Sequence, residues 1–347
     1  MKKSNNKKIK IMHLLFSNSF SGAENVVCTI IENYKGSEYD MYYCCPKGPI
    51  ENILKERKIK YLPLKKWSIF EIRRAIKQND IDIIHAHDFT ASITSILTIF
   101  RGKIISHIHC NPDFIKKWNI YSIIYNFGIN RFYKIILVSK ETLTGTVFQK
   151  KLEKKMKVIN NVVNPARIVE KSKEHETEKY DILFFGRLID IKQPQIVIEV
   201  TEKLKKDFPN IKTCLVGDGT LMNKCKEMVK EYNLEKNVSL VGFKSNPFPY
   251  IKNSKIALMP SKTEGLPMSA IECLILNVPV LNSGKGGLST LFKDNKEFIC
   301  DTADEYYAKS KQILMNKEKV FNNKYQKIVS KYTDINDYIN EITSIYR

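Results

Sequence analysis

The sequence of 347 residues lacks any run of about 18 or more apolar residues, so it predicts no membrane-spanning helix. It also lacks C-x-x-C pairs among its eight cysteines, and none of them has zinc-ligand spacing with the six histidines. Several cysteines lie in strand-like runs, which indicates reduced thiols in a cytoplasmic protein. The basic start "MKKSNNKKIKIMHLLF" has only a short apolar part and no small-residue cleavage site after it. We therefore interpret this start as the first strand rather than a signal peptide.

Acidic residues are scarce in the first half of the chain. Residues 1–165 contain 28 Lys or Arg and 13 Asp or Glu, whereas the remainder contains 29 and 24, which gives net charges of +15 and +5. This asymmetry predicts an anionic partner for the first half: a membrane, a phosphate-bearing substrate or nucleic acid. Because no basic motif interleaved with aromatic residues is present, we expect no nucleic-acid partner.

Short apolar runs alternate with helix-like segments along most of the chain. Such runs suit strands that are buried on both faces of a parallel sheet, and the repeated strand–helix order predicts an α/β fold. We expect two doubly wound Rossmann-like domains facing across a cleft, over residues 1–165 and 166–330, and a C-terminal helix over 331–347 that packs back toward the first domain. The polar segment 164–179 predicts a linker. The strand-like runs of the second half are "YDILFFG", "IKTCLVG", "NVSLVGF", "KIALMPS", "VPVLNS" and "EFIC".

Polar and glycine residues follow the strands of the first half, where ligands of doubly wound sheets bind. Gly22 lies where a turn becomes a helix, and a residue without Cβ there lets backbone N–H groups approach a phosphate. The alternative is an ordinary helix start with Ser21 as the N-cap.

Histidines end two neighbouring strands of the first half. His85 and His87 share one face of the first strand, and His107 and His109 share one face of the second. No cysteine or carboxylate joins them at ligand spacing, so we expect no metal and favour one strand-end histidine bonded to a substrate oxygen. The "DID" at 80–82 resembles an acidic metal-binding motif, but it opens a strand, away from the ligand edge, so we do not interpret it as a metal site.

Two cations follow the first strand of the second half, in "FFGRLIDIKQP". Arg187 comes directly after the strand, and Lys192 comes at the start of a helix. Together they predict a clamp for a diphosphate; the alternative is a solvated basic pair. Phe243 ends another strand, where backbone groups can meet a flat base.

Two glutamates flank the start of a helix in "SKTEGLPMSAIECL", residues 261–274. Glu264 lies in the loop after a strand. The backbone of Gly265, Leu266 and Pro267, up to Met268, is expected to direct its N–H groups at a phosphate. Glu272 lies within an apolar run, where a carboxylate requires donors, and ribose hydroxyls are suitable donors. The stretch predicts that one glutamate holds a sugar and the other a ribose, with the diphosphate between them.

The stretch "EGLPMSAIE" resembles the donor-site motif of family four retaining glycosyltransferases, which have the GT-B architecture. Weaker matches cover most of the chain in the family's order: "SGAE", "HIHC", "VSK", "VINNVVN", "FFGRL…K", "VGDG" and "PVLNSGKGG". The resemblance implies that Glu264 contacts the transferred sugar and Glu272 the nucleotide ribose. It also implies that Arg187 and Lys192 bind the diphosphate and stabilise the leaving group.

The resemblance implies further roles for the first domain. Gly22 would cap the diphosphate, and His109 would hydrogen-bond the donor sugar near the reacting carbon. The first domain would bind the acceptor and the second the nucleotide-sugar, with no metal or other cofactor. The chain departs from the family pattern at Ser21, Asn277 and Thr290, where glycine, glycine and glutamate are usual, and "INNVVN" lacks the usual proline and glycine.

We therefore expect a retaining glycosyltransferase that moves a sugar from a nucleoside diphosphate, weakly favoured as UDP, to a glycan or lipid-linked glycan. By family analogy it would act in bacterial capsule, exopolysaccharide or lipopolysaccharide synthesis, in the cytoplasm at an anionic membrane surface. The segment "FIKKWNIYSIIYNFGINRFYK", which includes Lys116, Lys117 and Trp118, is the expected membrane contact. The alternatives are a nucleotide-sugar epimerase of the same fold and a non-catalytic glycan- or nucleic-acid-binding protein.

Overall fold

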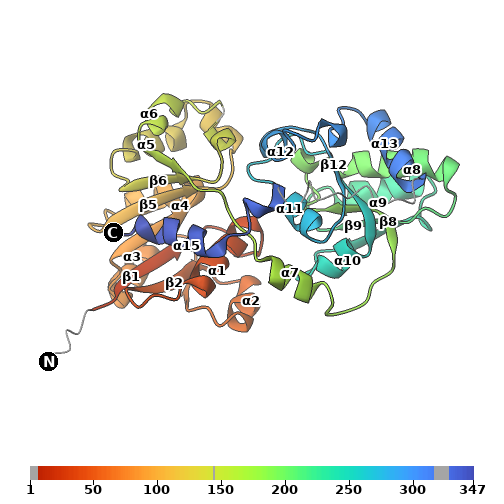
Figure 1. Ribbon diagram of the computed structural model, residues 1–347. Helices are drawn as coiled ribbons and strands as arrows, with labels where there is room; N and C mark the ends of the chain where they lie inside the picture. The colour runs from red at the N-terminus through yellow and green to blue at the C-terminus, as the bar shows by residue number, and fades with distance from the viewer. Residues whose placement is uncertain (1–6, 144, 316–327) are drawn as a thin grey trace. The chain divides into compact units, whose positions relative to one another are not determined.

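The computed structural model describes residues 7–143, 145–315 and 328–347, and the chain divides into two compact units (Figure 1). Unit 1 comprises Met1–Val162 and Ile335–Arg347, and unit 2 comprises Val163–Asp334. The C-terminal segment thus belongs to the same unit as the N-terminal half. Among the described residues, no helix is long and apolar enough to cross a membrane.

Unit 1 is built on a seven-stranded parallel sheet in the order β3-β2-β1-β4-β5-β6-β7. Apolar runs of the first half form its strands, because their side chains are covered on both faces of the sheet. The strands are β1 (Ile9–Leu14), β2 (Tyr39–Pro46), β3 (Tyr61–Leu64), β4 (Ile83–His87), β5 (Lys103–Ile108), β6 (Lys134–Leu137) and β7 (Met156–Val158).

Helices connect these strands, and local capping sets several of their starts. Ser68 accepts a hydrogen bond from the Glu71 amide at the start of α3, and Asn119 with Ser122 forms a capping box at α5. The helices of unit 1 are α1 (Gly22–Asn33), α2 (Ile50–Glu56), α3 (Ile69–Asn79), α4 (Asp88–Leu97), α5 (Ile120–Gly128), α6 (Gln149–Glu153) and α15 (Ile335–Ser344).

The C-terminal helix α15 lies beside α1 in unit 1 (Figure 1). Its apolar face, with Tyr338, Ile339 and Ile342, is buried in one cluster with Ile11 and Val26 of the first strand and helix. Residues more than 300 positions apart in the sequence therefore share one core. The burial of about 100 Å² or more per side chain makes this helix part of the stability of unit 1.

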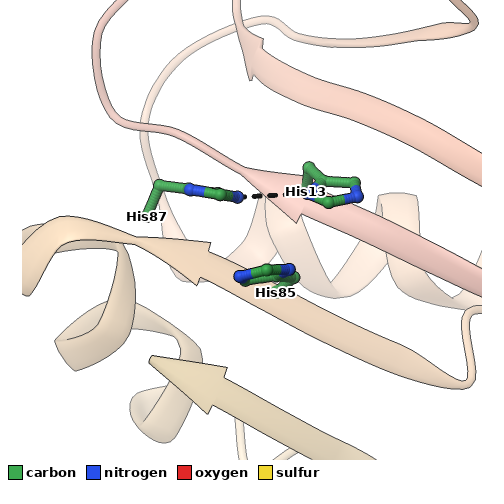
Figure 2. A group of neighbouring side chains, drawn as sticks. All are labelled: His13, His85 and His87. Atoms are coloured by element: carbon green, nitrogen blue, oxygen red, sulfur yellow. Dashed lines mark hydrogen bonds between the residues drawn. The ribbon is translucent and has the colours of Figure 1, made fainter. Parts of the chain in front are cut away.

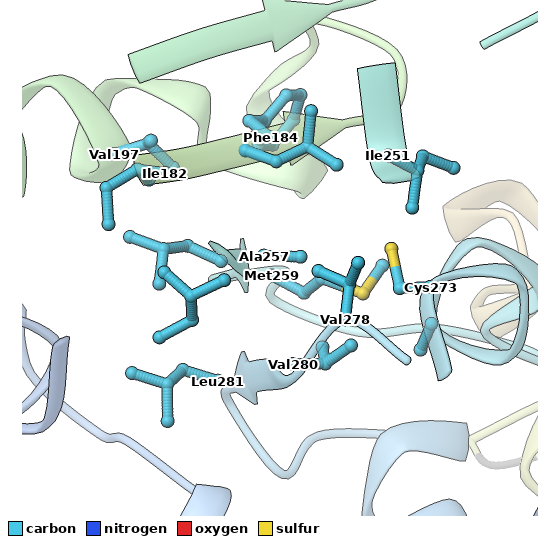
Figure 3. Close-up of a cluster of buried hydrophobic side chains, with 14 of the residues drawn as sticks. Ile182, Phe184, Val197, Ile251, Ala257, Met259, Cys273, Val278, Val280 and Leu281 are labelled. Carbon is cyan, nitrogen blue, oxygen red and sulfur yellow. The ribbon is translucent and has the colours of Figure 1, made fainter. Parts of the chain in front are cut away.

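Unit 2 repeats the same plan with five parallel strands in the order β10-β9-β8-β11-β12. Its core gathers aliphatic side chains of β8, β11, β12 and the covering helices (Figure 3). The strands are β8 (Tyr180–Phe185), β9 (Thr213–Val216), β10 (Val238–Gly242), β11 (Ser254–Met259) and β12 (Val280–Asn282). The helices are α7 (Pro165–Lys171), α8 (Pro194–Asp207), α9 (Met222–Glu231), α10 (Phe248–Lys252), α11 (Met268–Ile275), α12 (Gly287–Leu291) and α13 (Ala303–Met315).

Two local predictions are wrong. The linker expected over 164–179 begins with helix α7, because Asn164 caps its N-terminus by accepting a hydrogen bond from the Arg167 amide, and Pro165 suits the first turn. The run "EFIC" forms a 3-10 turn over Lys296–Phe298, and only a single bridge from Ile299 to Asn282 joins it to the sheet.

In both sheets the strand order reverses once. The reversal lies between β1 and β4 in unit 1 and between β8 and β11 in unit 2. Loops that leave two such strands diverge to opposite sides, and the crevice beyond their carboxyl ends is where doubly wound sheets bind ligands. The loops after β1, β4, β8 and β11 are therefore the candidates for function.

Candidate active site

In unit 2 an ion pair joins the loops that follow β8 and β11. Lys192, at the end of a 3-10 turn over Asp190–Lys192, places its Nζ atom 2.5 Å from Oε1 and 2.6 Å from Oε2 of Glu264. Ser261 donates a further hydrogen bond of 2.6 Å to Glu264 Oε1. The side chains are 17% and 9% exposed, so this is a largely buried pair with few water contacts. The structure thus brings together two of the predicted site residues at the strand reversal.

Close packing of glycines sets the backbone of the β8 loop. A Cβ atom on Gly217 would lie 1.9 Å from the carbonyl oxygen of Gly186, and one on Gly219 would lie 2.4 Å from that of Leu188. The Leu188 amide also donates to the Asp218 carbonyl at 2.9 Å. Glycine is therefore required at positions 217 and 219, because a side chain at either position would overlap the backbone of the loop after β8.

A second pair of glycines packs under Glu264. A Cβ atom on Gly287 would lie 1.9 Å from the Gly265 carbonyl oxygen, and one on Gly286 would lie 2.3 Å from that of Glu264. The Gly287 amide donates to the Glu264 carbonyl at 2.8 Å. The loop after β12 thus fixes the backbone on both sides of the carboxylate-bearing residue.

The row of amides expected before α11 is shorter than predicted. Pro267 is the N-cap residue and has no N–H group, and the Met268 amide donates to the Leu266 carbonyl at 2.9 Å. Gly265 and Leu266 are half-buried at the start of this turn. Pro267 has no N–H group and the Met268 N–H is already bonded, so neither contributes a donor to the expected row.

Glu272 lies in the second turn of α11 and is only 8% exposed. Within the described residues, its carboxylate has no hydrogen bond or ion pair, and burial raises its pKa to about 8. A buried carboxyl group without a donor is costly to ionise. The predicted need of this residue for external donors is therefore consistent with its surroundings.

The remaining predicted residues of unit 2 are exposed. Arg187 follows β8 with its side chain in solvent, and Phe243, 55% exposed, follows β10. Asn277 has a φ of 58°, the left-handed region in which glycine is usual and asparagine is tolerated, which explains why asparagine can replace the family's glycine. Thr290 is exposed in α12.

In unit 1, Gly22 is the first residue of α1, and a Cβ atom on it would meet no atom within 4 Å. The fold of the unit therefore does not require glycine there. Ser21 takes the N-cap position without capping α1 through its side chain; its hydroxyl instead donates to Glu24 at 2.5 Å. Burial raises the pKa of Glu24.

Five of the six histidines form one cluster at the carboxyl ends of β1, β4 and β5, in which His109 is half-buried and the other four are buried. The His13 and His87 rings approach at 3.1 Å between Nδ1 and Nε2, and Figure 2 shows them beside His85. A 2.9 Å contact continues from His87 Nδ1 to His109 Nε2. On the other side, His85 contacts His107 at 3.1 Å. The sequence pattern predicted the pairing of faces for four of these residues but did not include His13.

The histidines are neutral rings. Burial lowers the pKa of His13 and of His109 to about 3, and it lowers the pKa of His85, His87 and His107 well below the usual value of a histidine. A neutral imidazole has one N–H donor and one acceptor nitrogen, so these rings link into chains by hydrogen bonds. His109 is therefore a neutral hydrogen-bonding group.

Asp88 holds the backbone beside His109. Its carboxylate accepts hydrogen bonds from the amides of His109 at 2.7 Å and Cys110 at 3.2 Å. Asp88 itself has a φ of 67°, a conformation that aspartate tolerates. Asp88 directly follows "HAH" at the end of a strand, and this position is the sequence signal by which it could have been predicted as a site residue.

Two histidine triples have one ring nitrogen each within 4.8 Å of the others: His13, His85 and His87, and His87, His107 and His109. Imidazole nitrogens at such distances are able to bind a transition metal. The expectation that no metal is needed stays a prediction.

Comparison with known proteins agrees with this geometry. Residues 20–167 match the family described as Glycosyltransferase Family 4, and residues 166–333 match Glycosyl transferases group 1. The two matches cover both units and include all the predicted site residues. The chain is a family 4 glycosyltransferase.

Two relatives of this glycosyltransferase span most of its length. The capsular polysaccharide biosynthesis glycosyltransferase CapH of Staphylococcus aureus is 27% identical over 369 aligned positions, which cover 97% of this chain and 98% of CapH. The N-acetylgalactosamine-N,N'-diacetylbacillosaminyl-diphospho-undecaprenol 4-alpha-N-acetylgalactosaminyltransferase of Campylobacter jejuni subsp. jejuni serotype O:2 is 25% identical over 312, covering 83% and 84%.

Among solved structures, the crystal structure of Anabaena Alr3699/HepE in complex with UDP and glucose matches with a TM-score of 0.82. It is 18% identical and covers 97% of this chain and 98% of that one. The likeness confirms the predicted fold class, two Rossmann-like domains of the GT-B type.

We predict that acid destabilises unit 1 of the glycosyltransferase. The pKa values of the five clustered histidines are lowered in the folded state, so the unfolded chain binds more protons. The contribution of these neutral histidines to the free energy of unfolding is fully present above about pH 6.5. It is lost as the pH falls, by about 1.4 kcal/mol per pH unit for each histidine, and for His13 and His109 this loss continues toward about pH 3. Urea unfolding followed by tryptophan fluorescence measures this, because both tryptophans, Trp67 and Trp118, lie in unit 1. An unfolding free energy that stays constant from pH 7.5 to 5 contradicts the prediction.

A second prediction concerns the cost of Glu272. Its raised pKa means that stability present below about pH 4.5 is lost as the pH rises toward 8, where the buried group ionises. Glu272→Gln removes that charge, so the ligand-free variant should be more stable than the wild type at pH 8, by about 1 kcal/mol or more. At pH 4.5 the two proteins should be equal. Calorimetry of both, with the exposed-helix change Glu231→Gln as control, checks this. An equal or lower stability of the variant at pH 8 opposes it.

Proposed function

We propose that this glycosyltransferase moves a sugar from a nucleoside diphosphate to a glycan or lipid-linked glycan, with retention at the anomeric carbon, in bacterial surface polysaccharide synthesis. The observation that carries the proposal is the Lys192–Glu264 pair, with the unpartnered Glu272 in the helix that follows. Relatives named for capsule, diphospho-undecaprenol-linked and O-antigen synthesis support the acceptor class.

The donor is proposed to lie along the turn from Glu264 to Glu272. Arg187 and Lys192 supply positive charge to the diphosphate, and the amide of Leu266 adds a neutral donor. Glu272 accepts hydrogen bonds from the ribose hydroxyls, which provides the donors that the protein does not. Glu264 binds the transferred sugar, and Phe243 lies beside the base. Because HepE is described in complex with UDP and glucose, we propose a UDP-linked donor.

Gly22 and His109 of unit 1 keep the roles that the resemblance implies, at the diphosphate and at the donor sugar. Support comes from the open space above Gly22, which the fold itself does not need, and from the neutral, hydrogen-bonded state of His109. A neutral ring can donate to or accept from a sugar hydroxyl without adding a charge.

The function is tested by incubating purified protein with UDP-sugars in excess EDTA, with and without undecaprenyl-diphosphate-linked acceptors. We expect UDP release and a new glycosidic linkage only with acceptor, with the donor's anomeric configuration, read by NMR. Because cationic side chains and amides supply the positive charge, turnover should survive the chelator. Conversion of the UDP-sugar to an isomer without acceptor indicates the epimerase. Loss of turnover in EDTA that a divalent metal restores refutes the metal-free site.

We predict that Arg187→Ala and Lys192→Ala each lower kcat by about 10²-fold or more. Charge develops on the leaving diphosphate in the transition state, and fixed cations there contribute about 3 kcal/mol. The matched control is Lys212→Ala, which removes an exposed lysine paired with Glu178, and it should leave kcat within about twofold. Wild-type rates in both folded variants remove the assignment of the diphosphate site.

We further propose that the enzyme binds to the cytoplasmic face of an anionic membrane through α5. This helix points apolar side chains outward, with Ile120 63%, Tyr121 57% and Phe127 75% exposed, and Trp118 before it is 58% exposed. One face of α5 packs in the core of the unit, where Tyr125 is fully buried, and the other face carries these exposed side chains. From Phe89 to Lys140 the chain has seven Lys or Arg and one acid, Asp113, so the surroundings are cationic. An apolar face ringed by cations fits the interface of an anionic bilayer.

Vesicle flotation tests this surface. Binding should require phosphatidylglycerol and fall in 1 M salt, where the Debye length is about 3 Å. Replacing Lys116, Lys117 and Trp118 together by alanine should reduce the bound fraction several-fold, since each lysine contributes about 1 kcal/mol. The control variant Lys224→Ala with Lys226→Ala, on α9 of unit 2, should bind as the wild type does. Equal recovery with neutral and anionic vesicles contradicts membrane docking.

A further inference from the structure

A cavity of about 750 Å³ opens at the amino ends of the strands of unit 1. Its walls come from the starts of β1, β4 and β5 and from the turn between α5 and β6, and its floor includes the buried residues Ile83, Phe132 and Tyr346. In a parallel sheet the amino and carboxyl ends lie at opposite edges, about 20 Å apart for a six-residue strand such as β1. The cavity is therefore separate from the loops that carry the proposed transfer reaction.

The lining of this cavity is strongly cationic. Asp82 is its single acidic residue among the described lining residues, and that carboxylate already accepts a hydrogen bond of 2.8 Å from the Lys10 amide. Six cations stand against it: Lys7, Lys8, Arg101, Lys103, Arg131 and Lys155.

Backbone oxygen atoms orient three of these cations, and Lys103 also donates to the backbone oxygen of Arg347, the last residue of the sequence. Lys103 donates to the Tyr346 carbonyl at 3.0 Å, Arg131 to the Gly102 carbonyl at 3.1 Å, and Lys155 to the Ile129 and Asn130 carbonyls at 3.1 Å. Lys103 also lies over the Tyr133 ring, 4.3 Å from its centre. A carbonyl orients an ammonium or guanidinium group without cancelling its charge. Elsewhere in unit 1, Arg57 and Arg74 pair with glutamates.

We infer that this cavity is a second anion site, one that binds a phosphate group. Fixed cations cost little further ordering when an anion arrives, and a guanidinium matches phosphate oxygens in pairs. The apolar floor and the exposed Ile9, Ile99 and Tyr133 nearby in the chain suit a phosphate that carries an organic group. Two sources share this chemistry, a free phosphate and the phosphodiester of a phospholipid headgroup.

The first arm of the test uses inorganic phosphate. The donor site is saturated with UDP, and phosphate is then titrated by calorimetry into the wild type and into Arg101→Gln with Arg131→Gln. We expect the double variant to bind phosphate at least about fivefold more weakly. Because Arg131 also holds two carbonyl groups, Lys8→Gln with Arg101→Gln is the second variant; neither side chain forms a hydrogen bond or ion pair within the described residues. Lys224→Gln with Lys226→Gln is the matched control for charge.

The second arm uses vesicles of phosphatidylglycerol and, at equal surface charge, vesicles of a fatty acid. A headgroup site requires that both cavity variants, which keep α5 intact, lose binding to phosphatidylglycerol but not to the carboxylate vesicles. Cavity-dependent binding in the first arm alone identifies free phosphate as the ligand. If phosphate and phosphatidylglycerol both bind the wild type, the cavity variants and the control alike, the inference is wrong.

Discussion

The ion pair between Lys192 and Glu264 is the interaction on which the proposed donor site depends. It joins the loops after β8 and β11 across the reversal of strand order, where a parallel sheet leaves a crevice. A largely buried pair is costly to desolvate and even costlier to break, so each loop holds the other in place. Glycines make this approach possible, since side chains at Gly217 and Gly287 would overlap backbone atoms. The site is thus fixed by backbone packing before any ligand binds.

In unit 1 the corresponding strand ends carry neutral groups instead of an ion pair. Five imidazoles lie together there, and the fold tolerates this cluster because each ring is uncharged and most ring nitrogens are hydrogen-bonded. The chain of contacts begins inside the unit, at His13, and ends at His109, which Asp88 fixes through its backbone amide. The tautomer of His109 is therefore tied to that of His87. Glu272 has the opposite situation, because its carboxyl group is buried and has no partner among the residues that the structure describes.

The fold could be predicted from the sequence because buried parallel strands have a simple signature, a continuous apolar run between turns. The candidate residues followed from one rule, that ligands lie beyond the carboxyl ends of strands, which located Lys192, Glu264 and Glu272. The rule gave no information on contacts between side chains. It therefore missed the Lys192–Glu264 pair, and it missed His13, whose neighbours on β4 are some 70 residues away in the chain.

Other misses have local causes. Asn164 and Pro165 start helix α7 within the expected linker. Pro267 was included in the expected row of amide donors, but a proline has no N–H group. The cationic cavity could not be predicted from the sequence, because its residues come from the starts of strands, where no ligand site was expected. Net charge indicated an anionic partner for this half of the chain, but only the folded arrangement separates the exposed face of α5 from the cavity.

The most direct test of the account is a crystal structure with bound UDP. The account predicts both ribose hydroxyls within hydrogen-bond distance of the Glu272 carboxylate, and the diphosphate within reach of Lys192 and the Leu266 amide. A nucleotide bound elsewhere, with Glu272 still without a partner, would contradict it.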